Sequence, residues 1–284
     1  MTENQWTEFV KIREDFKKRV KNWNDVLKTE SIAALQKELA DADGVPEYPL
    51  ENAVVYNTAF DSVTAESAVK LIVVGDNPGK SEQLNKNRTY LIGQSGKIAE
   101  GFFRNHAELG IDFRKDVLIL NKTPVHTAKT KELVQFCKRA GKVAADIMAE
   151  SQKYMALLAF RLQQLFSCEI WIVGYGELKP KGVFARYRDC LYGLYAGCAV
   201  NGSAAAGNGN VMCYEGGCAA PGSASAGRDA AGYSAVGNAK MGDFEKSVFV
   251  YQHFSMNRFS IDLKTQGGDL HAVGTLHRKE IFGY

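Results

Sequence analysis

Four short runs of β-branched and other apolar residues, each followed by glycine or a polar residue, constrain this chain more than any other feature. They are residues 71–74 (Leu-Ile-Val-Val), 117–120 (Val-Leu-Ile-Leu), 170–173 (Ile-Trp-Ile-Val) and 248–251 (Val-Phe-Val-Tyr). Stretches long enough for helices separate them, and strands that alternate with helices form parallel sheets through βαβ units. The pattern predicts an α/β fold with three αβα layers and a central, mostly parallel, four-stranded sheet.

Helices are expected around these runs. Residues 3–28 carry large apolar side chains on one helical face and many Lys and Arg on the other, so the basic face is either a solvated surface or a contact for a DNA backbone. A short helix over 32–40 ends before Gly44 and Pro46. Further helices are expected at 95–109, capped by Ser95, at 130–166 with a break near Gly141, and at 178–195.

The chain reads as one domain over residues 1–284, with an N-terminal helical region at 1–45 and a Gly/Ala-rich insertion at 199–243. Nearly half of that insertion is Gly or Ala, and four of the six cysteines flank it or lie in it: Cys190, Cys198, Cys213 and Cys218. Their spacing is unusual for zinc. We expect no metal and no other cofactor, although a zinc or iron–sulfur site in this region is the alternative.

Charge and hydropathy limit the expected cellular location and the expected classes of partner. The formal net charge is only +3, which permits a local basic face without requiring a nucleic-acid partner. No apolar run approaches the ~20 residues of a membrane span, and the N-terminus has no apolar signal-peptide core. We expect a cytoplasmic or nuclear monomer that does not associate with a membrane.

Polar residues stand at the carboxyl end of each predicted strand. Asp76 and Asn77 follow the first, Asn121 the second, Gly174 the third and His253 the fourth. Ligands of open parallel α/β sheets bind at that edge. The sequence therefore predicts a site in which these residues converge.

A phosphate-binding loop is one interpretation of the segment after the first strand. Gly-Asp-Asn-Pro-Gly-Lys-Ser, residues 75–81, is one residue shorter than GxxxxGK[ST]. Pro78 also removes a backbone N–H from the cradle that would hold a phosphate. Both departures argue against a nucleotide triphosphatase.

Cleavage of an N-glycosidic bond suits the converging residues better. The base leaves as an anion, so a histidine that donates to a base carbonyl stabilises charge that develops in the transition state. The attacking water needs orientation more than deprotonation. Asn77 can supply that orientation, and so can Asp76.

These residues carry a resemblance to the uracil-DNA glycosylase superfamily. Gly75–Gly79 resembles the first motif of that superfamily in its G-x-N-P-G form, and residues 90–97 (Tyr-Leu-Ile-Gly-Gln-Ser-Gly-Lys) resemble the segment that follows it. The run ending at Asn121 is similar to the strand whose terminal Asn binds the uracil edge. Residues 253–255 (His-Phe-Ser) resemble the H-P-S motif, with Phe254 where Pro is usual.

The resemblance implies a base-flipping enzyme that removes uracil, or a related deaminated base, from DNA and needs no cofactor. It implies catalytic roles for Asn77, Asp76 and His253. The base would be bound by Asn121, Tyr90, Leu91, Gly75, Pro78 and Gly79, with stacking from Tyr90, Phe102 or Phe103. DNA would be bound by Lys80, Ser81, Gln94, Ser95, Gly96, Lys97, Ser255, Met256, Asn257 and Arg258, and Met256, Arg258 or Phe259 would fill the gap that the flipped base leaves. The alternative is a nucleic-acid-binding member of the same fold with weak or no catalysis.

Overall fold

The central sheet has four strands, all of them parallel. The computed structural model describes residues 1–29, 32–197 and 241–283, and the insertion at 199–243 lies largely outside them. The strands β1 (Leu71–Gly75), β2 (Val117–Asn121), β3 (Glu169–Val173) and β4 (Val248–Tyr251) lie in the order β2-β1-β3-β4. Each neighbouring pair is in parallel register. The predicted four-stranded sheet is confirmed.

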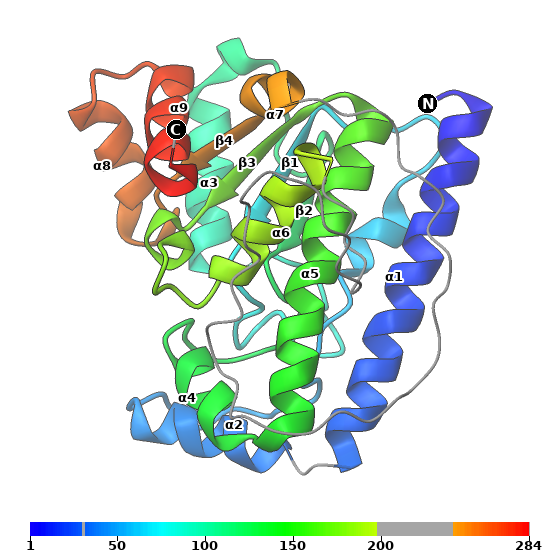
Figure 1. Ribbon diagram of the computed structural model, residues 1–284, viewed down its shortest axis with the longest axis vertical. Coiled ribbons are helices and arrows are strands. Elements are labelled where there is room, and N and C mark those ends of the chain that lie inside the picture. Colours follow the sequence, from blue (N-terminus) through cyan, green and yellow to red (C-terminus); the bar gives the residue numbers. More distant parts are fainter. Residues whose placement is uncertain (30–31, 198–240, 284) are drawn as a thin grey trace, which may run out of the picture.

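Helices cover both faces of this sheet and complete a three-layer αβα fold (Figure 1). The α-helices are α1 (Glu3–Thr29), α2 (Ile32–Ala42), α3 (Gln94–Asn105), α4 (Glu132–Arg139), α5 (Gly141–Phe166), α6 (Ala185–Tyr195), α7 (Met241–Ser247), α8 (Arg258–Thr265) and α9 (Leu270–Phe282). Short 3-10 helices are η1 (Thr58–Ser62), η2 (Ala107–Leu109), η3 (Tyr175–Leu178) and η4 (Ser255–Asn257).

The alternation of side chains along the strands divides the apolar interior into two cores. On β1, Ile72 and Val74 face a core built with α1, α5 and α6, whereas Leu71 and Val73 face a second core built with α3 and α8. Every residue of β1 is buried, as expected for a central strand covered on both faces. This double coverage leaves the strand ends as the accessible part of the sheet.

Some predicted helices need correction. The break near Gly141 is confirmed, since α4 ends at Arg139 and α5 begins at Gly141, which has φ +77°. The helix expected over 178–195 is wrong at its start, because residues 179–184 are not helical. Gly182 packs there against the carbonyl of Glu177, where a Cβ would lie 2.2 Å from the oxygen. Ser95 is not the cap of α3, which begins after Gly93.

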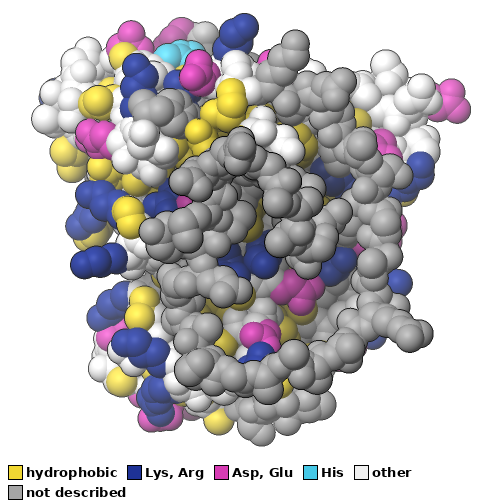
Figure 2. Space-filling view, viewed as in Figure 1, with side chains coloured by type: hydrophobic (Ala, Val, Ile, Leu, Met, Phe, Trp, Pro, Cys, Tyr) yellow, Lys and Arg dark blue, Asp and Glu magenta, His cyan; other side chains and the backbone are white. Residues whose placement is uncertain are grey.

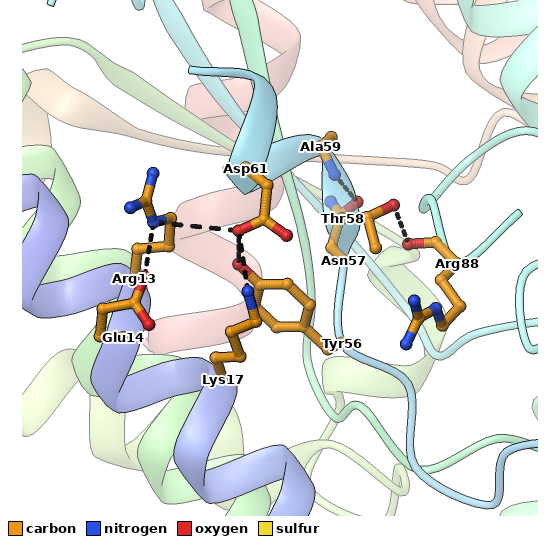
Figure 3. Close-up of polar contacts among 9 residues, drawn as sticks. All are labelled: Arg13, Glu14, Lys17, Tyr56, Asn57, Thr58, Ala59, Asp61 and Arg88. Carbon is orange, nitrogen blue, oxygen red and sulfur yellow. Dashed lines mark hydrogen bonds and ion pairs between the residues drawn. The ribbon is translucent and has the colours of Figure 1, made fainter. Parts of the chain in front are cut away.

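The basic face of α1 is largely neutralised by acidic side chains. Arg13 and Lys17 both reach Asp61 of η1, at 3.9 and 3.5 Å, and the hydroxyl of Tyr56 donates to the same carboxylate (Figure 3). Arg19 pairs with Glu150 at 2.9 Å, from α5. These pairs favour the solvated-surface interpretation of α1 over a DNA contact. No helix in the described part of the chain is long and apolar enough to cross a membrane.

Candidate functional site

The strand order places the predicted site at a topological switch point. The chain passes from β1 outward to β2 and then returns across β1 to β3, and open α/β sheets bind ligands where the order reverses in this way. The four strand ends lie side by side over three spacings of about 4.8 Å, or roughly 14 Å. In Figure 1 these ends and the loops that follow them face the left side of the molecule.

Asn77 presents an amide whose orientation is dictated by its surroundings. Its nitrogen Nδ2 faces three acceptors: Oγ1 of Thr127 at 3.0 Å, the carbonyl of Thr127 at 3.4 Å and the carbonyl of Pro78 at 3.3 Å. Its oxygen Oδ1 accepts no hydrogen bond from a described residue and the side chain is only partly buried. Asn77 therefore offers a fixed acceptor, as a water-orienting residue requires.

His253 presents a fixed donor. The backbone N–H of Ser255 donates to its Nδ1 at 3.1 Å, and Oγ of Ser255 lies 2.9 Å from the same atom. An Nδ1 that accepts carries no proton, so the neutral ring is protonated at Nε2. Burial lowers the pKa of His253, the nearby Lys122 charge lowers it further and Asp76 opposes both. The ring is therefore neutral at pH 7 and can donate from Nε2.

Asn121 lies at the end of β2 and contributes a donor that no described residue satisfies. The side chain is buried and its Nδ2 has no hydrogen-bond partner in the structure. Its Oδ1 lies over Gly75, where a Cβ would stand 2.6 Å away. Glycine at 75 thus leaves room for the amide, and a buried donor without a partner costs stability unless a ligand fills it.

Asp76 is held by a buried lysine that the sequence interpretation missed. Nζ of Lys122, with a side chain fully inaccessible to solvent, lies 2.6 Å from Oδ1 of Asp76. It also donates to the carbonyls of Gly75 and Val173, at 3.3 and 2.5 Å. Burial lowers the pKa of Lys122, and the Asp76 charge opposes that shift. On the other side, Gly174 has φ +96° and a Cβ there would lie 2.2 Å from the Asp76 carboxylate.

The aromatic residues proposed for base stacking lie in the interior. The ring of Tyr90 is fully buried and its hydroxyl donates to the carbonyl of Val55 at 2.5 Å. Phe102 and Phe103 belong to the core between the sheet and α3, which agrees with a packing role. Leu91 has φ +51°, and Gly96 packs so tightly on its carbonyl that a Cβ would lie 1.5 Å from the oxygen. In this conformation none of these rings is open to a base.

The loop after β4 has an exposed tip and is anchored by buried aromatic residues. Met256 and Asn257 have φ of +54° and +56°, and 69% of Met256 is exposed. Phe254, the departure from the H-P-S pattern, is buried and stacks on Phe259 with ring centroids 4.5 Å apart. Phe259 is therefore a core residue, which leaves Met256 and Arg258 as candidates to enter a base stack.

Cations surround the strand ends without acidic partners. Lys80 and Lys97 are exposed, as are Ser81 and Gln94, whereas Ser95 is half-buried and Gly96 is buried. Lys and Arg side chains gather along the left side of the molecule in Figure 2, the side that the strand ends face in Figure 1. Several cations in the segments after the strands form no ion pair with a described residue: Lys80, Lys97, Lys179, Lys181, Arg186 and Arg258.

The phosphate-loop interpretation is wrong. Residues 79–93 form turns and contain no helix, and the next helix, α3, begins only at Gln94. A phosphate loop must lead directly into a helix N-terminus. Among the described residues no group of three or more His, Cys, Asp or Glu could hold a metal, and Cys198, Cys213 and Cys218 lie outside them.

Several polar residues of the site had a usable signal in the sequence. Lys122, His126 and Thr127 lie in the segment that follows Asn121 and are all buried. A polar segment that follows a strand end in a parallel sheet is expected to line that edge. Glu82 is another buried polar residue, in the segment that follows β1. Burial raises its pKa to about 7, and the N–H groups of Gly79, Leu91 and Ile92 oppose that shift.

Comparison with known proteins adds no assignment. No family model, no curated protein and no solved structure matches the chain. The fold and the site define a three-layer α/β protein with polar groups at the carboxyl edge of its parallel sheet.

Proposed function

We propose that the protein is a monofunctional DNA glycosylase that hydrolyses the N-glycosidic bond of uracil, or of a related deaminated base, after flipping it out of DNA. The observation that carries the proposal is the set of three strand-end groups whose hydrogen-bonding roles are fixed. These are the Asn77 oxygen as an acceptor, the Asn121 amide nitrogen as a donor without a partner and the His253 Nε2 as a donor.

Each group suits one requirement of the reaction. A water held by Oδ1 of Asn77 would keep a lone pair for attack on the sugar carbon. His253 would donate to a base carbonyl as negative charge develops on the leaving base. Asn121 would read the edge of uracil, and cytosine would leave buried polar groups unpaired.

Asp76 would take a supporting role. Its Oδ1 is held by the buried ammonium of Lys122 in an ion pair, whereas Oδ1 of Asn77 accepts no hydrogen bond from a described residue. We infer that Asn77 orients the water and that Asp76, paired with Lys122, acts through its charge. The carboxylate would stabilise the positive charge that develops on the sugar, as fixed charges do in a preorganised site.

Binding of the nucleic acid would use the carboxyl edge of the sheet. The unpaired cations around the strand ends would contact phosphates, and Met256, exposed at a strained loop tip, would enter the stack vacated by the flipped base. The partner is then DNA that contains uracil or another damaged base, bound by a single copy of the chain.

The proposal is tested by release of uracil from single-stranded and double-stranded oligonucleotides, with matched thymine oligonucleotides as controls. The expected result is an abasic product from the uracil substrates. Asn77→Ala protein purified in parallel should bind the same DNA and release far less base, which excludes a contaminating enzyme. DNA binding without any abasic product would support the alternative, a binding protein of the same fold that has lost catalysis.

A further inference from the structure

The loop after β2 contains a hydroxyl that determines which end of the Asn77 amide faces the site. Thr127 is almost completely buried, with 1% of its surface exposed. Its Oγ1 donates to the carbonyl of Lys129 at 3.0 Å and receives Nδ2 of Asn77 at 3.0 Å. Because the hydroxyl proton is committed to Lys129, Oγ1 can only accept from Asn77.

The other neighbours of this amide are also acceptors. The carbonyls of Thr127 and Pro78 lie 3.4 and 3.3 Å from Nδ2. A rotation of the amide by 180° would place Oδ1 against the Thr127 hydroxyl oxygen and two carbonyl oxygens, with no proton between them. The orientation with Oδ1 away from Thr127 is therefore strongly preferred.

A second contact holds the same loop against the segment after β1. Nδ1 of His126 lies 2.8 Å from the carbonyl of Pro78, and its Nε2 lies 2.9 Å from the hydroxyl of Tyr48. A carbonyl only accepts, so Nδ1 carries the proton and Nε2 accepts from Tyr48. Burial lowers the pKa of His126 to about 4, so this arrangement persists at neutral pH.

We propose that Thr127 is a positioning residue that fixes the Asn77 amide with Oδ1 toward the attacking water. This inference rests on the proposed glycosylase function and goes beyond it in naming the group that orients the water-binding residue. Thr127 does not touch the substrate. It acts through Asn77, and His126 keeps the two loops in register.

The test uses the full chain with Thr127→Val, which removes the Oγ1 acceptor at 3.0 Å and keeps the shape, and Thr127→Ser, which retains a hydroxyl at this position. Thr123→Val is the matched control. Thr123 belongs to the same loop and is equally buried, but its hydroxyl contacts Ser151 at 2.7 Å rather than Asn77. A general loss of packing would affect both valine variants.

The first measurement does not depend on activity. With ¹⁵N only in asparagine, the Asn77 side-chain amide is identified as the signal missing from Asn77→Ala. We expect its protons to exchange with solvent at least ~10-fold faster in Thr127→Val, because a bonded amide exchanges only when it opens. Thr127→Ser and Thr123→Val should match the wild type. Equal exchange in wild type and Thr127→Val would overturn the proposal.

The second measurement is uracil release. We expect kcat of Thr127→Val to fall roughly 10- to 100-fold through misorientation of the water, with KM within about threefold of wild type. Thr127→Ser should recover most of kcat. A loss that serine does not restore, or that Thr123→Val shares, would overturn the positioning role. A wild type that releases no base would refute the glycosylase proposal, and the exchange comparison would still decide whether Thr127 holds the amide.

Discussion

Replacement of Lys122 by methionine tests the central electrostatic feature of the site. The substitution keeps the aliphatic stem and removes an ammonium whose side chain is wholly inaccessible to solvent. That ammonium lies within 2.6 Å of Asp76, and it also bonds the carbonyls of Gly75 and Val173. Its removal leaves a carboxylate without its counter-charge at the junction of β1 and β3.

The structure sets the size of the effect. Removal of one partner of a buried ion pair costs about 3–5 kcal/mol, and the Asp76 side chain, 12% exposed, keeps only a little hydration to reduce that cost. The Gly75 carbonyl still accepts the backbone N–H of Lys122 at 3.0 Å, whereas Val173 loses its contact with Nζ. We therefore expect Lys122→Met to lower the free energy of unfolding by about 3–4 kcal/mol.

The assay is urea unfolding followed by tryptophan fluorescence, since Trp171 is buried in β3 beside the site. Lys97→Met, which removes an exposed lysine that forms no ion pair with a described residue, should change stability by less than ~0.5 kcal/mol. The double variant Asp76→Asn/Lys122→Met should lose about 1–3 kcal/mol less than the sum of the single losses. A loss below about 1 kcal/mol in Lys122→Met, or strict additivity in the double variant, would refute this account of the pair.

Three further predictions concern activity and pH. Asn77→Ala and His253→Ala should each lower uracil turnover at least ~100-fold, the scale of one lost transition-state contact; unchanged rates in both would remove these roles. The pKa of His253 is lowered from the ordinary histidine value of 6.5, so the neutral donor persists as pH falls, and the pH–rate profile should decline only below that value. An acid limb at or above it would contradict the assignment. Burial raises the pKa of Glu82 in the folded state to about 7 from an ordinary value of 4.5, so the folded state binds its proton more tightly and stability falls as pH rises through this window. Glu82→Gln should flatten that slope in unfolding experiments at about pH 4.5–7.5, and an unchanged slope would argue against this account.

Local sequence patterns are sufficient to determine the layer architecture of this protein. Short apolar runs rich in β-branched residues, each followed by glycine or a polar residue, define strands, and the spacing between them leaves room for crossover helices that make the sheet parallel. Gly141 has φ +77°, so the glycine within the long helical pattern correctly predicts where one helix ends and the next begins. The clustering of Asn77, Asn121 and His253 at one edge follows from the same topology. The sequence pattern overestimates the length of the helix over 178–195, because the tight packing of Gly182 on Glu177 depends on contacts that a periodic pattern does not contain.

Only the tertiary structure determines which hydrogen-bond and ion-pair partners the candidate groups have. Sequence placed Asp76 and Asn77 side by side as equivalent candidates for the water, and nothing in their neighbours distinguished them. The fold then brings Lys122 under Asp76 and Thr127 against Asn77, 46 and 50 residues away. It also buries Tyr90, which the sequence offered as a stacking ring. Hydrogen-bonding roles and burial depend on which atoms meet across different strands and loops, and a linear pattern records only which residues arrive at the same edge.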